Sequence, residues 1–264
     1  FSSFKLSYFC GMSEQRYFLK LSYKGTHFFG WQRQPNAITV QEYIEDALTQ
    51  MNRNREVKIT GCGRTDTGVH AAEFYAHFEM NADWNTETFA YKLNCMIPED
   101  IAIQKVIKVP EGLHSRFSAT SRTYHYFVHN EKNPFLNKTS WLVRQDLDLE
   151  KMNKASDLLT KHENFKCFSK TITGISSFKC DVTAAHWTKT SGGYQFTIQA
   201  NRFLRNMVRA IVGTMVDLGT GKIEFSDFQK ILDSQERSKA GQSVPPQGLF
   251  LVKVDYDNDK TIID

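Results

Sequence analysis

The stretch between Gly61 and Ala71 limits the possible folds more than any other part of this chain, because it fits neither a regular strand nor a helix. Glycines at positions 61, 63 and 68 surround a single carboxylate, Asp66, with hydroxyl side chains at Thr65 and Thr67. Glycines at this density indicate backbone at positive φ, or a place that another group approaches closely. Asp66 is therefore a candidate for chemistry, although an aspartate that caps its own turn would produce the same pattern.

The first part of the chain alternates between the periods of strands and helices. Period-two alternation predicts strands, and apolar residues three and four apart predict helices. Thr39 and Glu42 predict a capping box at the start of the first helix. The predicted order is strand 17–23, helix from 39, strand 57–60, strand 74–80, helix 87–96 and strand 101–109. This order indicates an α+β module built on an antiparallel sheet.

The second part repeats that plan with insertions. The predicted elements are strand 121–129, helix 149–159, a polar and mobile stretch over 161–177, strands 179–188 and 194–200, helix 202–218, a helix from Ser226 with Gln229 as its capping partner, and strand 250–256. The whole chain is therefore predicted to be α+β.

The predicted helix over 202–218 carries three arginines, Arg202, Arg205 and Arg209, spaced three and four residues apart. This spacing would place three guanidinium groups along one side of the helix. Such a stripe is usually a solvated face, but no carboxylate at matching spacing neutralises it, and Asp217 is two turns further on. A phosphate-binding or active-site role for at least one of them is the other possibility.

Composition limits the class of protein. With 264 residues, 41% of them hydrophobic, the chain is long enough for one large domain or two small ones. The net charge of +4 is small, so a polyanion site would require clustered charge. The five cysteines are scattered without a Cys-x-x-Cys pair, which predicts a reduced, cytoplasmic protein. No apolar run could span a bilayer and no signal peptide is evident; Met12 is predicted to be the natural start, after an extension or tag over residues 1–11.

Three chemistries are disfavoured by the sequence. Cys62, His70 and His77 lack the spacing of a zinc site, so no metal is predicted. An aspartyl phosphatase needs a second acid near Asp66, and Glu73 is not placed for that role. A serine or cysteine hydrolase would need a nucleophile elbow, which the sequence lacks. A lone carboxylate, arginines and aromatic loops remain, and they indicate a metal-independent enzyme, or else a binder, that acts on RNA.

Five sequence blocks resemble the TruA family of tRNA pseudouridine synthases, in family order and over essentially the whole chain after Met12. The blocks are residues 63–71, residues 17–23 with 30–34 and 39–42, residues 114–119 with 122–124, residues 203–209, and residues 245–249. Two small departures, Ser115 and Val244, stand where alanine is frequent in the family, and neither is a catalytic position.

The resemblance implies a role for each candidate residue. Asp66 would be the nucleophile, attacking either the base or the ribose carbon of the target uridine. Tyr124 would stack on the flipped base and transfer a proton, Arg209 would pair with Asp66, and Arg64 would keep the base extruded. The implied candidates for phosphate contacts are Arg116, Arg122, Arg202 and Arg205.

The resemblance also implies the fold, the partners and the substrate. It implies the pseudouridine synthase fold, with two pseudo-symmetric halves, a largely antiparallel central sheet flanked by helices, and a catalytic cleft between the halves. The expected boundaries are 12–115 for the half with the aspartate loop and 116–264 for the half with the tyrosine and the arginine. A homodimer that modifies the anticodon stem-loop of tRNA without a cofactor is expected. A catalytically silent RNA binder is the alternative.

Overall fold

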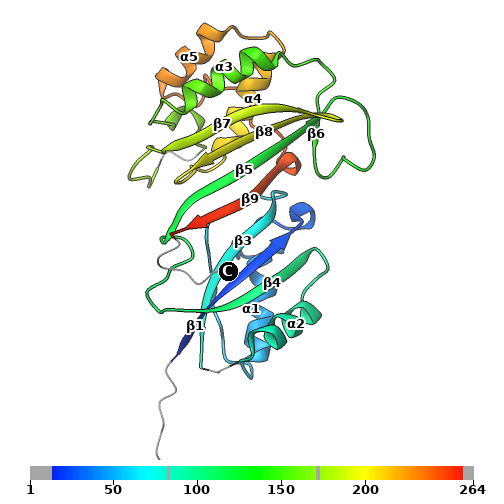
Figure 1. Ribbon diagram of the computed structural model, residues 1–264, viewed down its shortest axis with the longest axis vertical. Helices are drawn as coiled ribbons and strands as arrows, with labels where there is room; N and C mark the ends of the chain where they lie inside the picture. The colour runs from blue at the N-terminus through cyan, green and yellow to red at the C-terminus, as the bar shows by residue number, and fades with distance from the viewer. Residues whose placement is uncertain (1–13, 82–83, 171–172, 258–264) are drawn as a thin grey trace, which may run out of the picture.

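The computed structural model describes residues 14–81, 84–170 and 173–257, and its centre is one nine-stranded mixed sheet (Figure 1). The strand order is β4-β1-β3-β9-β5-β8-β7, with β2 paired to β3 and β6 paired to β5. The strands are β1 (Gln15–Tyr23), β2 (Thr60–Gly61), β3 (His70–Met80), β4 (Ile101–Val109), β5 (Ala119–His129), β6 (Trp141–Leu142), β7 (Val182–Thr190), β8 (Gly193–Ala200) and β9 (Leu249–Tyr256). Pairing is antiparallel except between β3 and β9 and between β5 and β6. This confirms the mixed helix-and-strand class with a mostly antiparallel sheet.

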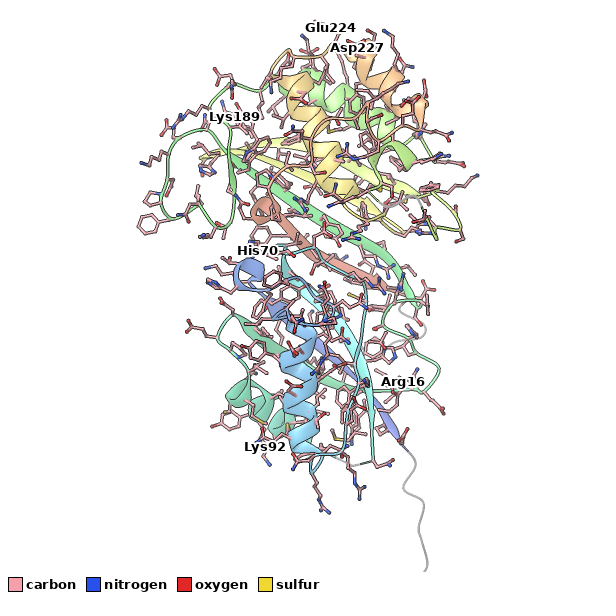
Figure 2. All side chains as sticks on the ribbon, turned by 180° about the vertical axis from the view of Figure 1, so that it is seen from behind. Arg16, His70, Lys92, Lys189, Glu224 and Asp227 are labelled. Carbon is pink, nitrogen blue, oxygen red and sulfur yellow. The ribbon has the colours of Figure 1, made fainter. Side chains whose placement is uncertain are left out.

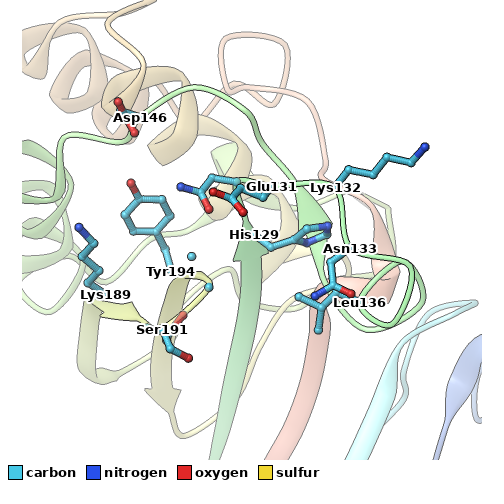
Figure 3. A pocket seen from close by; sticks show the side chains of 13 residues that line it. His129, Glu131, Lys132, Asn133, Leu136, Asp146, Lys189, Ser191 and Tyr194 are labelled. Atoms are coloured by element: carbon cyan, nitrogen blue, oxygen red, sulfur yellow. The ribbon is translucent and has the colours of Figure 1, made fainter.

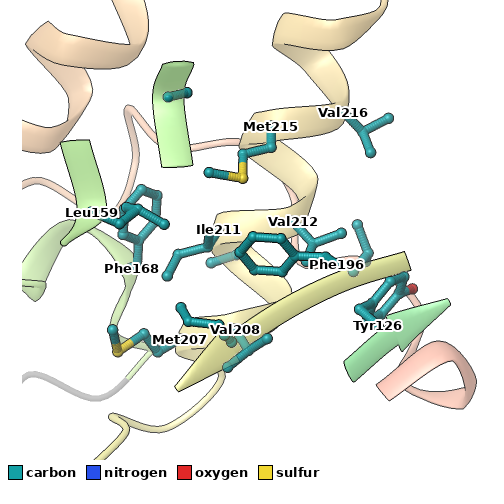
Figure 4. Packing of buried hydrophobic residues seen from close by; sticks show 14 of the residues in the cluster. Tyr126, Leu159, Phe168, Phe196, Met207, Val208, Ile211, Val212, Met215 and Val216 are labelled. Carbon is teal, nitrogen blue, oxygen red and sulfur yellow. The ribbon is translucent and has the colours of Figure 1, made fainter. Parts of the chain in front are cut away.

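Two hydrophobic clusters stabilise the sheet. Helices α1 (Val40–Met51) and α2 (Thr86–Met96) belong to the first cluster, in which the rings of Tyr17 and Phe78 stack with centroids 5.4 Å apart. Helices α3 (Leu149–Leu159), α4 (Met207–Gly219) and α5 (Phe225–Ser234) belong to the second, where Ile211 and Val212 of α4 lie beside Phe196 (Figure 4). Burying a side chain of this size stabilises a fold by about 1.5–3 kcal/mol. Both clusters therefore have the large apolar side chains that a stable core requires.

The two clusters meet where β9 lies between β3 and β5 (Figure 1). The parallel pairing of β3 with β9 covers only two residue pairs, His70 with Phe250 and Ala71 with Leu251. Further along, a Glu73 side-chain oxygen accepts the backbone N–H of Val254 at 2.9 Å. The Glu73 side chain thus provides a hydrogen bond between β3 and β9 beyond the end of their backbone pairing.

Helix α4 corrects the prediction for the arginine stripe. It begins at Met207, five residues later than predicted, because Asn206 adopts a left-handed conformation with φ 67°. The Asn206 side-chain amide also bonds the hydroxyl of Ser243, far along the chain. Arg202 and Arg205 therefore precede the helix, and the predicted row of three guanidinium groups on one helix face is wrong.

Several other boundaries differ in smaller ways. Thr39 caps α1 as predicted and accepts the N–H of Glu42, but the Glu42 carboxylate contacts Arg33, at 3.5 Å. Helix α5 begins at Phe225 with Glu224 as its cap, not at Ser226. The predicted strand over 57–60 is only Thr60–Gly61.

The stretch predicted to be polar and mobile contributes to the second core. The side chains of Phe165, Cys167 and Phe168 are fully buried there, and residues Lys166–Phe168 form a short 3-10 turn. Cys62, Cys95, Cys167 and Cys180 are free thiols, whereas Cys10 and Met12 lie outside the described residues. Within the described ranges, no helix has the length and apolar character to cross a bilayer.

Candidate active site

Asp66 lies in the loop between β2 and β3, and a neighbouring segment fixes this loop. The Trp31 N–H donates to the carbonyl oxygen of Thr65 at 3.4 Å, and the hydroxyls of Tyr23 and Thr65 share a hydrogen bond of 2.8 Å. Gly30 has φ +88°, and a Cβ added there would lie only 2.3 Å from the same Thr65 carbonyl. Residue 30 must be glycine for both reasons. The residue directly before Asp66 is therefore held on two sides.

Arg209, in the first turn of α4, binds the Asp66 carboxylate. Its Nη1 donates to Oδ2 of Asp66 at 3.2 Å, and its Nε donates to the Val244 carbonyl at 2.7 Å. The Val244 N–H in turn donates to the Arg209 carbonyl at 3.2 Å. The Asp66 side chain keeps 30% of its surface exposed and that of Arg209 keeps 17%. The carboxylate is thus oriented by a cation and remains accessible to a ligand.

Tyr124 of β5 packs against both hydrophobic clusters, with its ring perpendicular to that of Phe203 at a centroid distance of 5.1 Å. Burial raises the pKa of the Tyr124 phenol, and the nearby Cys62 and Asp66 act in the same direction. Tyr124 therefore keeps its proton at neutral pH.

Arg122 donates hydrogen bonds to four carbonyls in three backbone segments. Its Nη1 donates to the carbonyls of Ala119 and Asn201, each at 2.9 Å, and its Nη2 donates to those of Cys62 at 3.1 Å and Arg116 at 2.6 Å. These bonds use the four N–H groups of both terminal nitrogens, so only Nε–H is left for any other acceptor. Sequence reasoning placed Arg122 among the phosphate contacts and did not anticipate these bonds.

The other arginines of the candidate set are exposed, namely Arg64, Arg116, Arg202 and Arg205. Within the described ranges none of them forms an ion pair, whereas Arg209 does. The guanidinium of Arg116 lies over the ring of Phe117, 5.5 Å from the centroid. Phe117, 75% exposed, was not singled out by the sequence analysis, although a large aromatic residue directly after an arginine could have signalled it.

The histidines and the cysteine near Asp66 have structural partners. His70 Nδ1 accepts the Gly25 N–H at 3.0 Å, and its Nε2 lies 3.0 Å from the Lys138 carbonyl, at the level of the β3–β9 junction (Figure 2). His77 Nδ1 accepts the Ser115 N–H at 3.2 Å, and burial lowers the pKa of His77 to about 4. Cys62 is buried, which raises its pKa to about 12. In the part of the chain that the structure describes, no group of these residue types is arranged to hold a metal ion.

A pocket of about 310 Å³ lies away from these residues, where β5 ends and β7 turns into β8 (Figure 3). His129, Lys189 and Tyr194 line it together with the loop that carries Glu131 and Asn133. None of the candidate site residues lines this pocket.

The chain is similar to known proteins over most of its length. A family model described as tRNA pseudouridine synthase matches residues 21–118 and 156–257. The chain is 44% identical to tRNA pseudouridine synthase A of Bacteroides fragilis over 250 residues, covering 94% of this chain and 99% of that protein. It is 46% identical to the Bacteroides thetaiotaomicron protein of the same name over 248 residues, covering 93% of this chain and 92% of that protein. It is 36% identical to the Bacillus licheniformis protein of that name over 241 residues, covering 90% of this chain and 98% of that protein. A solved dye-decolorizing protein from V. cholerae aligns over 80% of this chain and 88% of its own at 12% identity, but its TM-score of 0.20 supports no argument about fold.

Proposed function

Because the chain belongs to the tRNA pseudouridine synthase family, we propose that it isomerises uridine in the anticodon stem-loop of tRNA, with Asp66 as the nucleophile. The isomerase activity on tRNA uridine follows from the family. The observation that supports the role of Asp66 is its contact with Arg209, 143 positions away in the sequence. This contact holds the Asp66 carboxylate in one orientation while 30% of the side-chain surface stays exposed, as a nucleophile requires.

The reaction exchanges one glycosidic bond for another. The bond from N1 of uracil to C1′ of the ribose breaks, the base rotates, and a bond from C5 to C1′ forms. C5 loses its proton and N1 gains one, so no atom is gained or lost overall. Asp66 would add to the base or to the ribose carbon while the uracil is detached, and Arg209 would hold the carboxylate in the attacking orientation.

Tyr124 would contact the extruded base. As a neutral phenol it can stack on uracil and pass a proton between C5 and solvent, whereas a phenolate would repel Asp66. Arg64, exposed two residues before Asp66, would occupy the space that the base leaves in the RNA.

The phosphates would be bound by the exposed arginines Arg116, Arg202 and Arg205. For Arg122 only a contact through Nε is compatible with its four carbonyl bonds. The pseudo-symmetric halves, the cleft between them, the homodimer and the cytoplasmic location stay predictions. So does the independence from a cofactor.

A silent RNA binder is the alternative function. A binder would gain nothing from Asp66, because a carboxylate next to bound RNA repels the phosphates. The accessible, oriented carboxylate therefore favours the enzyme.

The test is release of tritium from bulk tRNA labelled at C5 of uracil, with a chelator present. Wild type should release tritium, and Asp66→Asn should release none, because the amide has nearly the same shape but is no nucleophile. The variant should bind tRNA as well as wild type or slightly better. Release by Asp66→Asn would refute the assigned nucleophile, and loss of wild-type release with the chelator would refute metal independence. If neither protein releases tritium and both bind tRNA, the silent binder is correct.

A further inference from the structure

Phe117 is held on a rigid turn with most of its ring exposed. His114 Nδ1 accepts the backbone N–H groups of both Arg116 and Phe117, at 3.1 and 3.2 Å. The Ser118 N–H donates to the His114 carbonyl at 2.9 Å, and the Ser118 hydroxyl accepts the His114 N–H at 3.0 Å. Phe117 nevertheless remains 75% exposed. Exposing an aromatic ring while its backbone is tightly bonded prepares it for a partner, because little conformational freedom is then lost on binding.

This turn lies beside the catalytic loop. Nη2 of Arg122 donates to the carbonyls of Arg116 and Cys62 together, so the two segments are joined through one nitrogen atom. Gly63 lies between Cys62 and Asp66 and faces open space, since a Cβ added there would meet nothing within 4 Å. The space next to Gly63 is therefore free for a ligand.

The charge around Phe117 favours a polyanion. Three exposed arginines lie within two residues of a carbonyl that Arg122 binds, namely Arg64, Arg116 and Arg202. None of the three forms an ion pair within the described ranges. The Arg116 guanidinium also lies over the Phe117 ring. A cation and an aromatic face together form the platform on which unpaired nucleic-acid bases stack. A lone exposed phenylalanine would indicate nothing, but this one lies among unneutralised arginines, on a turn that Arg122 joins to Cys62 in the segment before Asp66.

We propose that Phe117, with Arg116, is a second base-binding site, on which one unpaired tRNA base outside the catalytic pocket stacks. Arg122 positions this site relative to the Asp66 loop through its carbonyl bonds. The inference rests on the proposed function, because it takes tRNA as the ligand.

The protein side of the test measures tRNA affinity in the Asp66→Asn background, so that no turnover occurs. Phe117→Ala should weaken binding between about 5-fold and about 150-fold, the range for loss of one base stack. Phe117→Trp should restore the affinity, whereas Phe117→Leu should not, since leucine has no aromatic face. Tyr91→Ala is the matched control, because Tyr91 is an aromatic residue on α2 with 71% exposure, and it should leave the affinity unchanged. Unchanged affinity in Phe117→Ala, or an equal loss in Tyr91→Ala, would overturn the proposal.

The RNA side of the test identifies the stacked base. Anticodon stem-loops with one abasic loop nucleotide at a time are bound to the Asp66→Asn protein with and without Phe117→Ala. At one position, abasic substitution should weaken binding by the Phe117 protein and have almost no effect on the alanine variant. Equal losses in both proteins at every position would show that no base contacts Phe117.

Tritium release by the protein with native Asp66 separates the two hypotheses. If no tritium is released but one abasic position weakens binding only when Phe117 is present, the proposed function fails and the stacking site stands. If tritium is released but no abasic position distinguishes the two proteins, the proposed function stands and the stacking site fails.

Discussion

Replacing Arg209 with glutamine should lower the turnover far more than the stability. The ion pair with Asp66 is a single hydrogen bond of 3.2 Å between partly exposed side chains, so it stabilises the fold by only about 0.2–1 kcal/mol. Loss of the Nε bond leaves the carbonyl of the buried residue Val244 without that donor, which costs about 1–3 kcal/mol. We therefore expect the free energy of unfolding to fall by about 1–4 kcal/mol. Removing a preorganised charged contact from an active site lowers kcat by about 100-fold to 1,000-fold, and we expect the lower end here.

The assay is steady-state tritium release at saturating tRNA, which gives kcat, with urea unfolding of the same samples to establish that the variant is folded. Arg205→Gln is the matched control, because it removes the same charge from an exposed residue that precedes the helix and has no ion pair in the described part of the chain. It should weaken tRNA binding in a salt-dependent way and leave kcat unchanged. The reasoning would be refuted if folded Arg209→Gln kept kcat within about threefold of wild type, or if Arg205→Gln lowered kcat equally.

Two further predictions concern stability and the shape of the loop. Burial and the nearby His114 and Arg16 lower the pKa of His77 to about 4, so the unfolded chain binds the proton first as the pH falls through about 6.5. The free energy of unfolding should therefore drop by about 3 kcal/mol between about pH 6.5 and pH 4, and urea titrations should show a smaller drop in His77→Asn. Gly30→Ala should displace the Thr65 carbonyl and lower turnover in the tritium assay at least about tenfold. Gly63→Ala should leave the free energy of unfolding, measured with urea, within about 0.5 kcal/mol of wild type. If Gly30→Ala lowered neither turnover nor the free energy of unfolding more than Gly63→Ala does, the assigned close approach of Gly30 to Thr65 would be contradicted.

The sequence predicts best the features that depend on nearby residues. Thr39 caps its helix because the hydroxyl and the Glu42 N–H are three residues apart, a local relation that a pattern can contain. The glycines around Asp66 also predicted a loop there, and the structure has one between the end of β2 at Gly61 and the start of β3 at His70.

Features that depend on distant contacts were predicted poorly. The apolar spacing before Met207 fits a helix, yet Asn206 is held in a left-handed conformation beside Ser243, and no nearby residue signals this contact. Arg209 was therefore selected from a helical spacing that does not exist, although the resemblance assigned it the correct partner. Arg122 shows the same limit, because an arginine near an RNA site suggests phosphates, while its terminal nitrogens donate to four carbonyls from three separate segments.

The position of β9 has a consequence for how the protein is made on the ribosome. This strand, the last that the structure describes, lies in the middle of the sheet, between β3 and β5. A nascent chain that has not yet passed Tyr256 lacks the strand that joins the two hydrophobic clusters, so Asp66 and Arg209 have no fixed relation during most of translation. We therefore expect the contact between Asp66 and Arg209, and any activity that depends on it, to form only after β9 has been synthesised.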